Sequence, residues 1–303
     1  MVNGSKIING SKNGLIAAVD VGSAKIACFI AQPNGEGGVE VVGVGHQVSK
    51  GIKNGNISDM EAVEGSIRKA VEVAEQMAGE NVKSIITSIS GGVPKSNLIS
   101  FDVSISGNEI NDSDLKKALD PGWLHSQQPQ DRQVIHTPPI GYSIDGNRGV
   151  RDPRGMHGDK LGVNMNIMTA GAAAMRNLEG CINRCHLEIE SFVIAPHASG
   201  LGCLVEDEME LGAICIDMGA GTTTISVFID GEVFFVDSLP VGGIHVTKDL
   251  ARGLSTPLIY AERIKNLYGS ATSNISDDHE LIRIQLVGED ESETHQVPRS
   301  VIV

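Results

Sequence analysis

Aromatic residues, positive charge and long apolar runs are all scarce in this chain. Of its 303 residues only 3% are aromatic, and 38 Asp and Glu residues against 24 Lys and Arg give a formal net charge of −14. Binding to nucleic acid depends on positive charge and often on stacked aromatic rings, so the composition argues against a nucleic-acid partner. The sequence also lacks a run of about 18 apolar residues and a signal-peptide pattern. These absences predict a cytoplasmic protein.

Cysteine is too sparse to define a disulfide framework or a metal site. The five cysteines are an odd number, which predicts free thiols. Cys181 and Cys185, followed by His186, have the spacing of half a zinc site, but no second pair completes four ligands. We expect the two thiols to pack on a helix face.

What the sequence does contain is one pattern that occurs twice. Residues 15–30 and 213–229 each consist of an apolar run, an aspartate (Asp20 or Asp217), a glycine-containing turn and a second apolar run. Each segment predicts a tight β-hairpin, in which glycine lets backbone N–H groups approach phosphate oxygens. Two carboxylates can also hold a hydrated magnesium ion between them, so the pair predicts a site for Mg²⁺ and a phosphate chain. Hydroxyl donors at the two turns are Ser23, Thr222 and Thr223.

Plainer interpretations of the same residues stay open. Either aspartate could cap its own turn, and Lys25 could be a solvated strand residue rather than a phosphate ligand. Glu262 and Lys265 are three residues apart in an expected helix, where they could form an exposed ion pair. The duplication favours a paired site over two isolated caps. Both turns run from strand to strand, so neither is a dinucleotide-binding or Walker loop.

Hydrophobic spacing and capping residues predict a mixed α/β chain. A helix is expected over residues 60–78, with Ser58 and Glu61 as a capping box and Gly79 at its end. Another short helix, capped by Asn111 or Asp112, is expected to end at residue 119. Further helices are expected at 172–186, 197–205, 244–253 and 257–268, and further strands at 39–44, 82–89, 98–105, 161–168, 187–194, 281–287 and the end of the chain.

These elements divide the chain into four parts. Residues 1–13 have a polar, glycine-containing composition, which predicts a disordered tail. A first lobe is expected over 14–90 and 169–205, interrupted by an inserted subdomain at 91–168, and a second lobe over 206–303.

The two hairpins resemble the phosphate-1 and phosphate-2 motifs of the actin, hexokinase and sugar-kinase superfamily. Within it, the chain resembles the FtsA family of bacterial cell-division proteins. The resemblance implies an α/β, actin-like two-lobed fold with ribonuclease H-like sheets, an inserted small subdomain and, in this sequence, an incomplete second lobe. The segments that carry it are 14–30, 187–199, 212–223, 240–247 and 261–265, with 91–94 and 152–156 at the edges of the insertion.

The resemblance also implies a function and a set of binding residues. Such a protein binds ATP and Mg²⁺ between its lobes, polymerises into filaments at the inner face of the cell membrane at the division site, and links FtsZ and other division proteins there. Asp20 and Asp217 would hold the magnesium ion through water. The nucleotide-binding positions implied are Asp20, Gly22, Ser23 and Lys25 on phosphate 1, Asp217, Gly219, Gly221, Thr222 and Thr223 on phosphate 2, Gly242 and Gly243 in a turn near the nucleotide, and Glu262 and Lys265 on the adenosine-facing helix.

Three departures from the superfamily qualify this expectation. Many members carry an acidic residue where this chain has Thr224, and chaperone-type relatives carry a glutamate near Ala195, so at most weak ATPase activity is expected and no catalytic residue is assigned. The family's second adenosine motif and amphipathic membrane helix do not occur in this sequence, which predicts weakened nucleotide binding, an exposed apolar patch and no direct membrane anchoring by this chain. A small-molecule kinase of the same superfamily and a chaperone or pilus-assembly relative are the alternatives.

Overall fold

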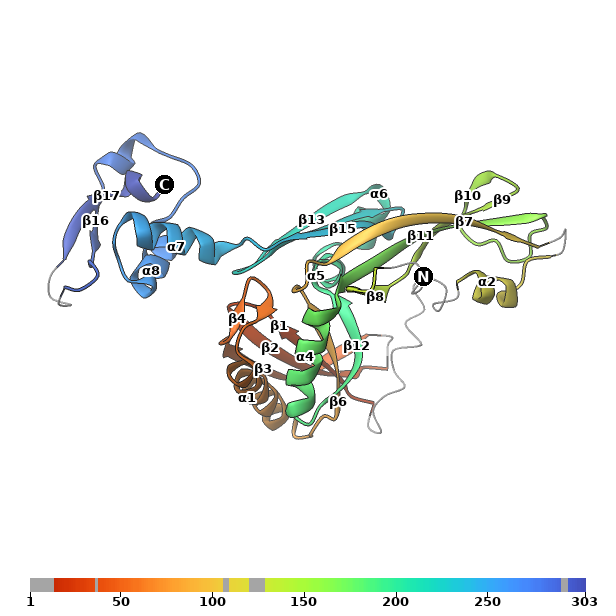
Figure 1. The fold of residues 1–303 in the computed structure, drawn as a ribbon, viewed down its shortest axis with the longest axis horizontal. Helices are drawn as coiled ribbons and strands as arrows, with labels where there is room; N and C mark the ends of the chain where they lie inside the picture. Colours follow the sequence, from red (N-terminus) through yellow and green to blue (C-terminus); the bar gives the residue numbers. More distant parts are fainter. Residues whose placement is uncertain (1–13, 36–37, 106–108, 120–128, 290–293) are drawn as a thin grey trace. The chain divides into compact units, whose positions relative to one another are not determined.

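The computed structural model describes residues 14–35, 38–105, 109–119, 129–289 and 294–303, so the predicted tail 1–13 lies outside the described residues. By its internal contacts the chain divides into two compact units, Met1–Pro240 and Val241–Val303. The first unit holds the three larger sheets, and the second holds two α-helices and a two-stranded sheet (Figure 1). None of the described helices is both long and apolar enough to span a membrane.

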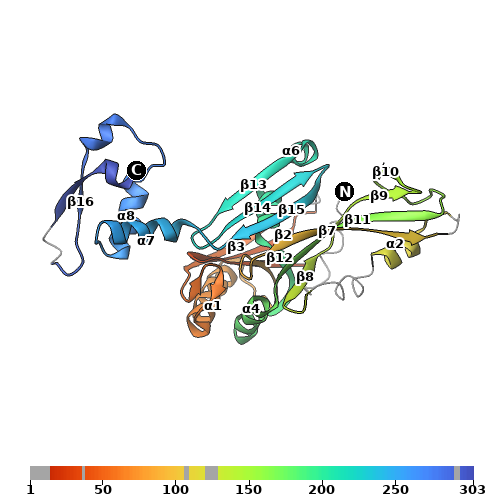
Figure 2. The same ribbon diagram turned by 45° about the horizontal axis from the view of Figure 1, so that its top comes forward.

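A five-stranded sheet carries the first predicted hairpin at its centre. The strand order is β12-β6-β1-β2-β3, with β1 antiparallel to β2 and parallel to β6. Helices α1 (Met60–Ala78) and α4 (Ala172–Arg184) cover one face, where they share an apolar core with the strands (Figure 2). The strands are β1 (Ile16–Val21), β2 (Lys25–Pro33), β3 (Val39–Val48), β6 (Ser84–Ile89) and β12 (Glu188–Ile194), and a small hairpin of β4 (Ile52–Lys53) and β5 (Asn56–Ile57) precedes α1.

The cap of helix α1 differs from the prediction. Asp59 is the N-cap, and its carboxylate accepts a hydrogen bond of 3.1 Å from a backbone N–H of the first turn. The Ser58 hydroxyl donates instead to the Gly51 carbonyl at 3.0 Å. The predicted capping box of Ser58 and Glu61 is therefore wrong. Gly79 ends the helix in the left-handed conformation, with φ of 73°, as predicted.

Strand β3 lies against α1 because two of its residues have no side chain. A Cβ atom on Gly45 would lie 1.9 Å from the Ala70 carbonyl oxygen, and one on Gly43 would lie 2.3 Å from that of Ala74. Backbone cannot yield as a flexible side chain can, so these two glycines set the distance between helix and sheet.

The insertion forms a second sheet with its own core. The strand order is β10-β9-β11-β7, and β8 also pairs with β11. Asn111 caps α2 through a capping box with Asp114, as one of the two predicted caps. The core contains Leu161, Val163, Met165 and Ile167 of β11. The elements are β7 (Lys95–Ser104), α2 (Asp112–Ala118), β8 (Arg132–His136), β9 (Pro139–Ile144), β10 (Asn147–Val150) and β11 (Lys160–Gly171).

A three-stranded sheet carries the second predicted hairpin. It consists of β13 (Ala213–Met218), β14 (Thr223–Ile229) and β15 (Glu232–Leu239), in that order. Helix α5 (Ala195–Cys203) packs on one face, and the short α6 (Glu206–Leu211) follows it. Side chains along β13 alternate between the two faces of the sheet. The apolar side chains on the face away from α5 are exposed: Ile214 by 63%, Ile216 by 57% and Met218 by 79%. The predicted exposed apolar patch is confirmed.

The second unit is built from α7 (Gly243–Gly253) and α8 (Leu258–Tyr268), which pack together. Its core contains Leu254, Ile264, Ile282, Ile284 and Ile302. The strand predicted over 281–287 is shorter, β16 (Leu281–Ile284), and pairs with β17 (His295–Pro298). The chain then closes in a 3₁₀ turn, η2 (Arg299–Ile302), and not in a strand as predicted; another 3₁₀ turn, η1 (Ile275–Asp278), follows α8.

Two half-buried histidines connect the insertion to helix α5. The rings of His136 on β8 and His197 on α5 meet edge to face with centroids 5.4 Å apart. His136 Nε2 accepts a hydrogen bond of 3.3 Å from the Ile194 N–H. Burial, together with the neighbouring His197, lowers the pKa of His136 to about 4, and burial lowers the pKa of His197 as well. The contact is therefore made by neutral rings.

Replacing Gly45 with alanine tests the close approach of β3 and α1. The added Cβ would meet the Ala70 carbonyl, so Gly45→Ala should lower the free energy of unfolding by about 1–3 kcal/mol. Gly65→Ala in α1 is the matched control, because nothing lies within 4 Å of its Cβ position. Alanine forms helix better than glycine in the interior of a helix, so Gly65→Ala should raise the free energy of unfolding by roughly 0.5–1 kcal/mol. Urea denaturation of both variants gives the comparison, and equal effects of the two would contradict the packing argument.

The histidine contact predicts a loss of stability in mild acid. The pKa of His136 is about 4 in the folded protein against an ordinary value of 6.5, so below pH 6.5 the unfolded chain binds a proton that the folded chain does not. Between pH 7 and pH 5 this single group should cost about 2 kcal/mol of unfolding free energy. His136→Gln keeps a hydrogen-bond acceptor for the Ile194 N–H but does not titrate. Urea unfolding at both pH values should show a smaller drop in the variant, and an identical drop would refute the prediction.

Candidate functional site

The two predicted hairpins close with the same turn. The Gly22 N–H donates to the Lys25 carbonyl at 3.1 Å, and the Gly219 N–H donates to the Thr222 carbonyl at 2.9 Å. A Cβ at Gly22 would lie 2.9 Å from the Lys25 carbonyl oxygen, and a Cβ at Gly219 would lie 3.1 Å from the Thr222 carbonyl oxygen. Both turns thus need glycine for the same steric reason. The predicted hairpins are confirmed, and these two N–H groups are used within the turns.

The structure brings the tips of the two hairpins together. A Cβ on Gly221 would lie 2.4 Å from the Ser23 hydroxyl oxygen, so the second turn lies directly on the first. The β4–β5 turn joins the same cluster, because the Gly55 N–H donates to the Ser23 hydroxyl at 3.1 Å. A Cβ on Gly55 would in turn be 2.9 Å from the Thr222 methyl carbon. Sequence reasoning missed Gly55, which adds a third backbone segment to the two predicted ones.

The two aspartates lie at the strand ends that lead into these tips. Asp20 on β1 is exposed and Asp217 on β13 is half-buried. Each carboxylate accepts one hydrogen bond from a serine on a neighbouring element: Ser88 of β6 donates to Asp20 at 2.5 Å, and Ser199 of α5 donates to Asp217 at 2.7 Å. Sequence reasoning did not identify either serine. Lys25, the predicted cation, is exposed at the start of β2.

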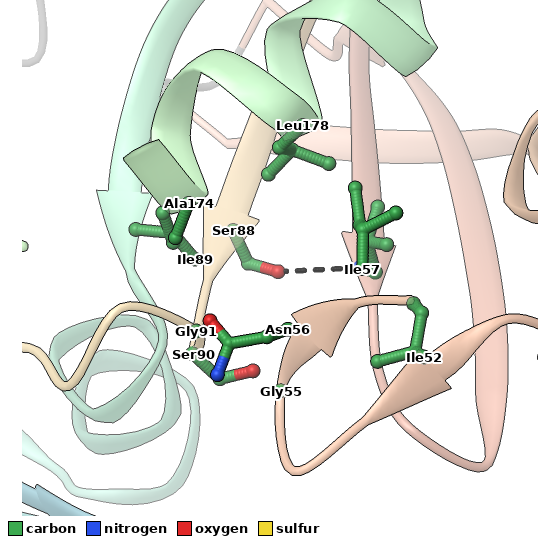
Figure 3. A pocket seen from close by; sticks show the side chains of 11 residues that line it. Ile52, Gly55, Asn56, Ile57, Ser88, Ile89, Ser90, Gly91, Ala174 and Leu178 are labelled. Atoms are coloured by element: carbon green, nitrogen blue, oxygen red, sulfur yellow. Dashed lines mark hydrogen bonds between the residues drawn. The ribbon is translucent and has the colours of Figure 1, made fainter. Parts of the chain in front are cut away.

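A small cavity adjoins the Asp20 side of this cluster. Ser88, Asn56 and Leu178 are among the residues that line it, and Figure 3 shows the Ser88 side chain pointing from β6 toward β1, with its hydrogen bond dashed. That bond joins the Ser88 hydroxyl to the Val21 N–H at 3.4 Å. With a volume of about 20 Å³, the cavity has room for one water molecule and not for a nucleotide.

The second unit carries the remaining predicted residues. Gly242 is the N-cap of α7, and Gly243 is its first residue. Lys265 of α8 uses its ammonium group to bond the Gly243 carbonyl at 3.2 Å, the Thr247 hydroxyl at 2.8 Å and the Glu262 carboxylate at 2.7 Å. The structure thus brings Gly243, Glu262 and Lys265 together, joined by Thr247, which sequence reasoning missed.

The electrostatics of this cluster favour a charged glutamate. Partial burial alone would raise the pKa of Glu262, but hydrogen bonds from Lys265 and Thr247 outweigh it and lower the pKa below its ordinary range. Glu262 is therefore ionised at neutral pH, and the predicted ion pair exists, with 22% of the Lys265 side chain exposed. The pair is bound to α7 and is not free on the surface.

The described residues contain no group of three or more His, Cys, Asp or Glu side chains that could hold a metal ion by themselves. Cys181 is fully buried, with its thiol against the Met60 sulfur, and burial raises the pKa of Cys185 to about 11. Both thiols pack between α4 and α1, as predicted. A magnesium ion at Asp20 and Asp217 would have to draw most of its ligands from water and phosphate, which is how this ion is commonly bound.

Solved structures share the fold at low sequence identity. The chain is similar to the structure described as "PilM-PilN type IV pilus biogenesis complex", with a TM-score of 0.60 and 15% identity over 84% of this chain and 70% of that one. It is also similar to MreB5 of Spiroplasma citri bound to ADP, with a TM-score of 0.50 and 13% identity over 95% of this chain and 72% of that one. The predicted actin-like α/β fold with an inserted subdomain is confirmed.

Family models and curated relatives agree on one family. The model "Cell division protein FtsA" matches residues 214–303, and "SHS2 domain inserted in FTSA" matches residues 91–169. FtsA of Rhizobium meliloti is 44% identical over 98% of this chain and 70% of its own length. FtsA of Pseudomonas aeruginosa is 35% identical over 91% of this chain and 66% of its own length. The chain therefore belongs to the FtsA family of cell-division proteins.

Proposed function

We propose that this protein, an actin-like scaffold of bacterial cell division by its family, binds ATP with Mg²⁺ where its two hairpin tips meet. In that state it polymerises and links FtsZ and other division proteins to the inner face of the membrane at the division site. The observation that supports the proposal most is the contact between Ser23 and Gly221, the tips of two equivalent turns that each follow an aspartate. Two such turns on opposite sides of one point suit a chain of phosphates.

The phosphate groups would be bound by hydroxyl and backbone donors of both tips. Ser23 accepts from Gly55, which leaves the proton of its own hydroxyl available to a phosphate oxygen. Gly221 brings the backbone of the second turn within reach because it has no Cβ. Thr222, Thr223 and the Lys25 ammonium would complete the contacts. Since Ser23 and Gly221 touch, a bound phosphate chain must separate the two tips.

Magnesium would add to the positive charge that Lys25 brings to the site of this acidic protein. Asp20 and Asp217 would hold it through water, with the remaining ligands from water and phosphate oxygens. Each of the two carboxylates has one oxygen bonded to a serine and a second oxygen for such water. These second carboxylate oxygens are the atoms of the proposed site that fit a hydrated Mg²⁺ ion.

For the adenosine we propose Gly242, Gly243, Glu262 and Lys265, all of which belong to the second unit. Gly242 and Gly243 begin α7, and a helix N-terminus offers N–H groups and a positive dipole end. Glu262 and Lys265 would contact ribose or base, and to do so Lys265 must exchange one of its three hydrogen bonds within the unit.

We also assign 14–90 with 169–205 to the first lobe, 91–168 to the insertion and 206–303 to the second lobe.

Hydrolysis is the weaker part of the proposed activity. Ala195, at the start of α5, has no side chain that could orient an attacking water, and Thr224 is a hydroxyl where many superfamily members have a carboxylate. The Thr224 hydroxyl is buried and, among the residues that the structure describes, has no hydrogen-bond partner. We therefore propose that the protein is a slow ATPase at most.

Nucleotide binding by the aspartate pair is tested with Asp20→Asn and Asp217→Asn. Each variant removes one negative charge that would hold the hydrated Mg²⁺, so the affinity for a fluorescent ATP analogue in Mg²⁺ should fall at least about tenfold. Asp102→Asn on β7 is a control, since this exposed aspartate belongs to the insertion. Fluorescence titration gives the affinities, and sedimentation with Mg²⁺-ATP reports filaments. Unchanged binding in both Asp20 and Asp217 variants would refute the site.

A further inference from the structure

The two aspartates share a feature that the hairpin pattern alone does not contain. Each carboxylate has one oxygen held by a serine hydroxyl from a different element: Asp20 Oδ1 by Ser88 at 2.5 Å, and Asp217 Oδ2 by Ser199 at 2.7 Å. Sequence separations of 68 and 18 residues show that these are tertiary contacts and not part of the turns. In each half of the proposed site, a serine from another element thus binds the aspartate.

Ser88 is held in a defined orientation. Its strand β6 runs parallel to β1, and the register pairs Val19 with Thr87, the residues directly before Asp20 and Ser88. The Ser88 oxygen also accepts from the Val21 N–H at 3.4 Å, so its own proton is directed to the carboxylate. The second Asp20 oxygen lies 4.0 Å from the Cβ position of Gly22 and therefore faces the turn.

Ser199 is fixed by the packing of α5 on the three-stranded sheet. The Pro196 carbonyl accepts from the Ser226 hydroxyl of β14 at 2.8 Å. One residue after Ser199, Gly200 lies so close to Phe228 that a Cβ there would be 2.3 Å from the ring. The helix is therefore tied to β14 on both sides of Ser199, which places the hydroxyl against Asp217.

We propose that Ser88 and Ser199 are positioning residues for the magnesium ion: each binds one oxygen of its aspartate and turns the other toward the water shell of the ion. This inference rests on the proposed function. Mg²⁺ demands near-octahedral geometry and keeps its waters, so a carboxylate that contacts it through water must be oriented. Groups that orient the ligands of a metal typically change its affinity 10–100-fold when they are removed.

A purely structural role for the serines makes a different prediction. Ser88 would then only join β6 to the end of β1, and Ser199 would only join α5 to β13. Their removal would lower the stability and weaken nucleotide binding equally with and without Mg²⁺. The magnesium dependence of binding, and not binding itself, separates the two roles.

The test is the affinity of a fluorescent ATP analogue for the full chain, measured in Mg²⁺ and in EDTA. Ser88→Ala and Ser199→Ala should each lower the affinity in Mg²⁺ roughly tenfold and leave the affinity in EDTA unchanged. Ser88→Thr, which keeps the hydroxyl and suits a strand, should restore the affinity in Mg²⁺. Ser100→Ala is the matched control, because it removes a hydroxyl that donates to Asn164 at 2.6 Å on the inserted sheet.

The measurements distinguish failure of the positioning role of the serines from failure of the nucleotide site itself. If Asp20→Asn and Asp217→Asn lose the Mg²⁺-dependent affinity but both serine-to-alanine variants keep it, the positioning role is overturned while the site stands. If the wild-type chain shows no gain in affinity with Mg²⁺, or the aspartate variants keep the full gain, the proposed function fails and the inference with it. Thermal unfolding of every variant with and without Mg²⁺-ATP shows whether each is folded, and a serine variant that loses affinity equally in Mg²⁺ and EDTA contradicts the proposal.

Discussion

The contact between the tips of two hairpins from separate sheets is the constraint on which the rest of the site depends. It exists because Gly221 has no Cβ where Ser23 lies, and because Gly22 and Gly219 close their turns at a carbonyl that a side chain would block. Helix α5 connects the sheets directly, since it begins where β12 of one sheet ends and packs on β13 and β14 of the other. Helix α5 thus links the two sheets that carry the aspartates.

The sequence predicted those parts of the structure that depend on neighbouring residues. A strand, an aspartate and a glycine turn in succession define a hairpin locally, so both hairpins could be found, and their duplication pointed to a shared site. The α1 cap shows the limit of this reasoning. Ser58 and Asp59 are both good capping residues, but Asp59 is the cap, and the Ser58 hydroxyl donates to the Gly51 carbonyl just before the β4–β5 hairpin. That contact comes from the fold and is not visible in the local pattern.

Residues that complete the site from a distance could not be predicted. Ser88 lies in a strand of small and apolar residues, and only its register with β1 brings it to Asp20. Thr247 reaches Glu262 and Lys265 because α7 packs on α8. Strands β8 and β9 form because they pair with β11. In each case the signal is a pairing between distant segments, which one sequence without its fold does not contain.

If the two hairpin tips bind phosphate as proposed, the side chains around them separate binding from cleavage. In the proposed site, hydroxyls and carboxylates fixed by serines would hold a metal and a phosphate chain, whereas cleavage also needs a group that orients water opposite the leaving group. The position beside Asp217 on β14 is Thr224, a neutral hydroxyl that cannot accept a proton at neutral pH, and the start of α5 is Ala195. If the proposed site binds nucleotide and cleaves it slowly, the nucleotide would stay bound for longer. Such retention would suit the proposed scaffold role, in which the bound nucleotide would keep two sheets in one arrangement.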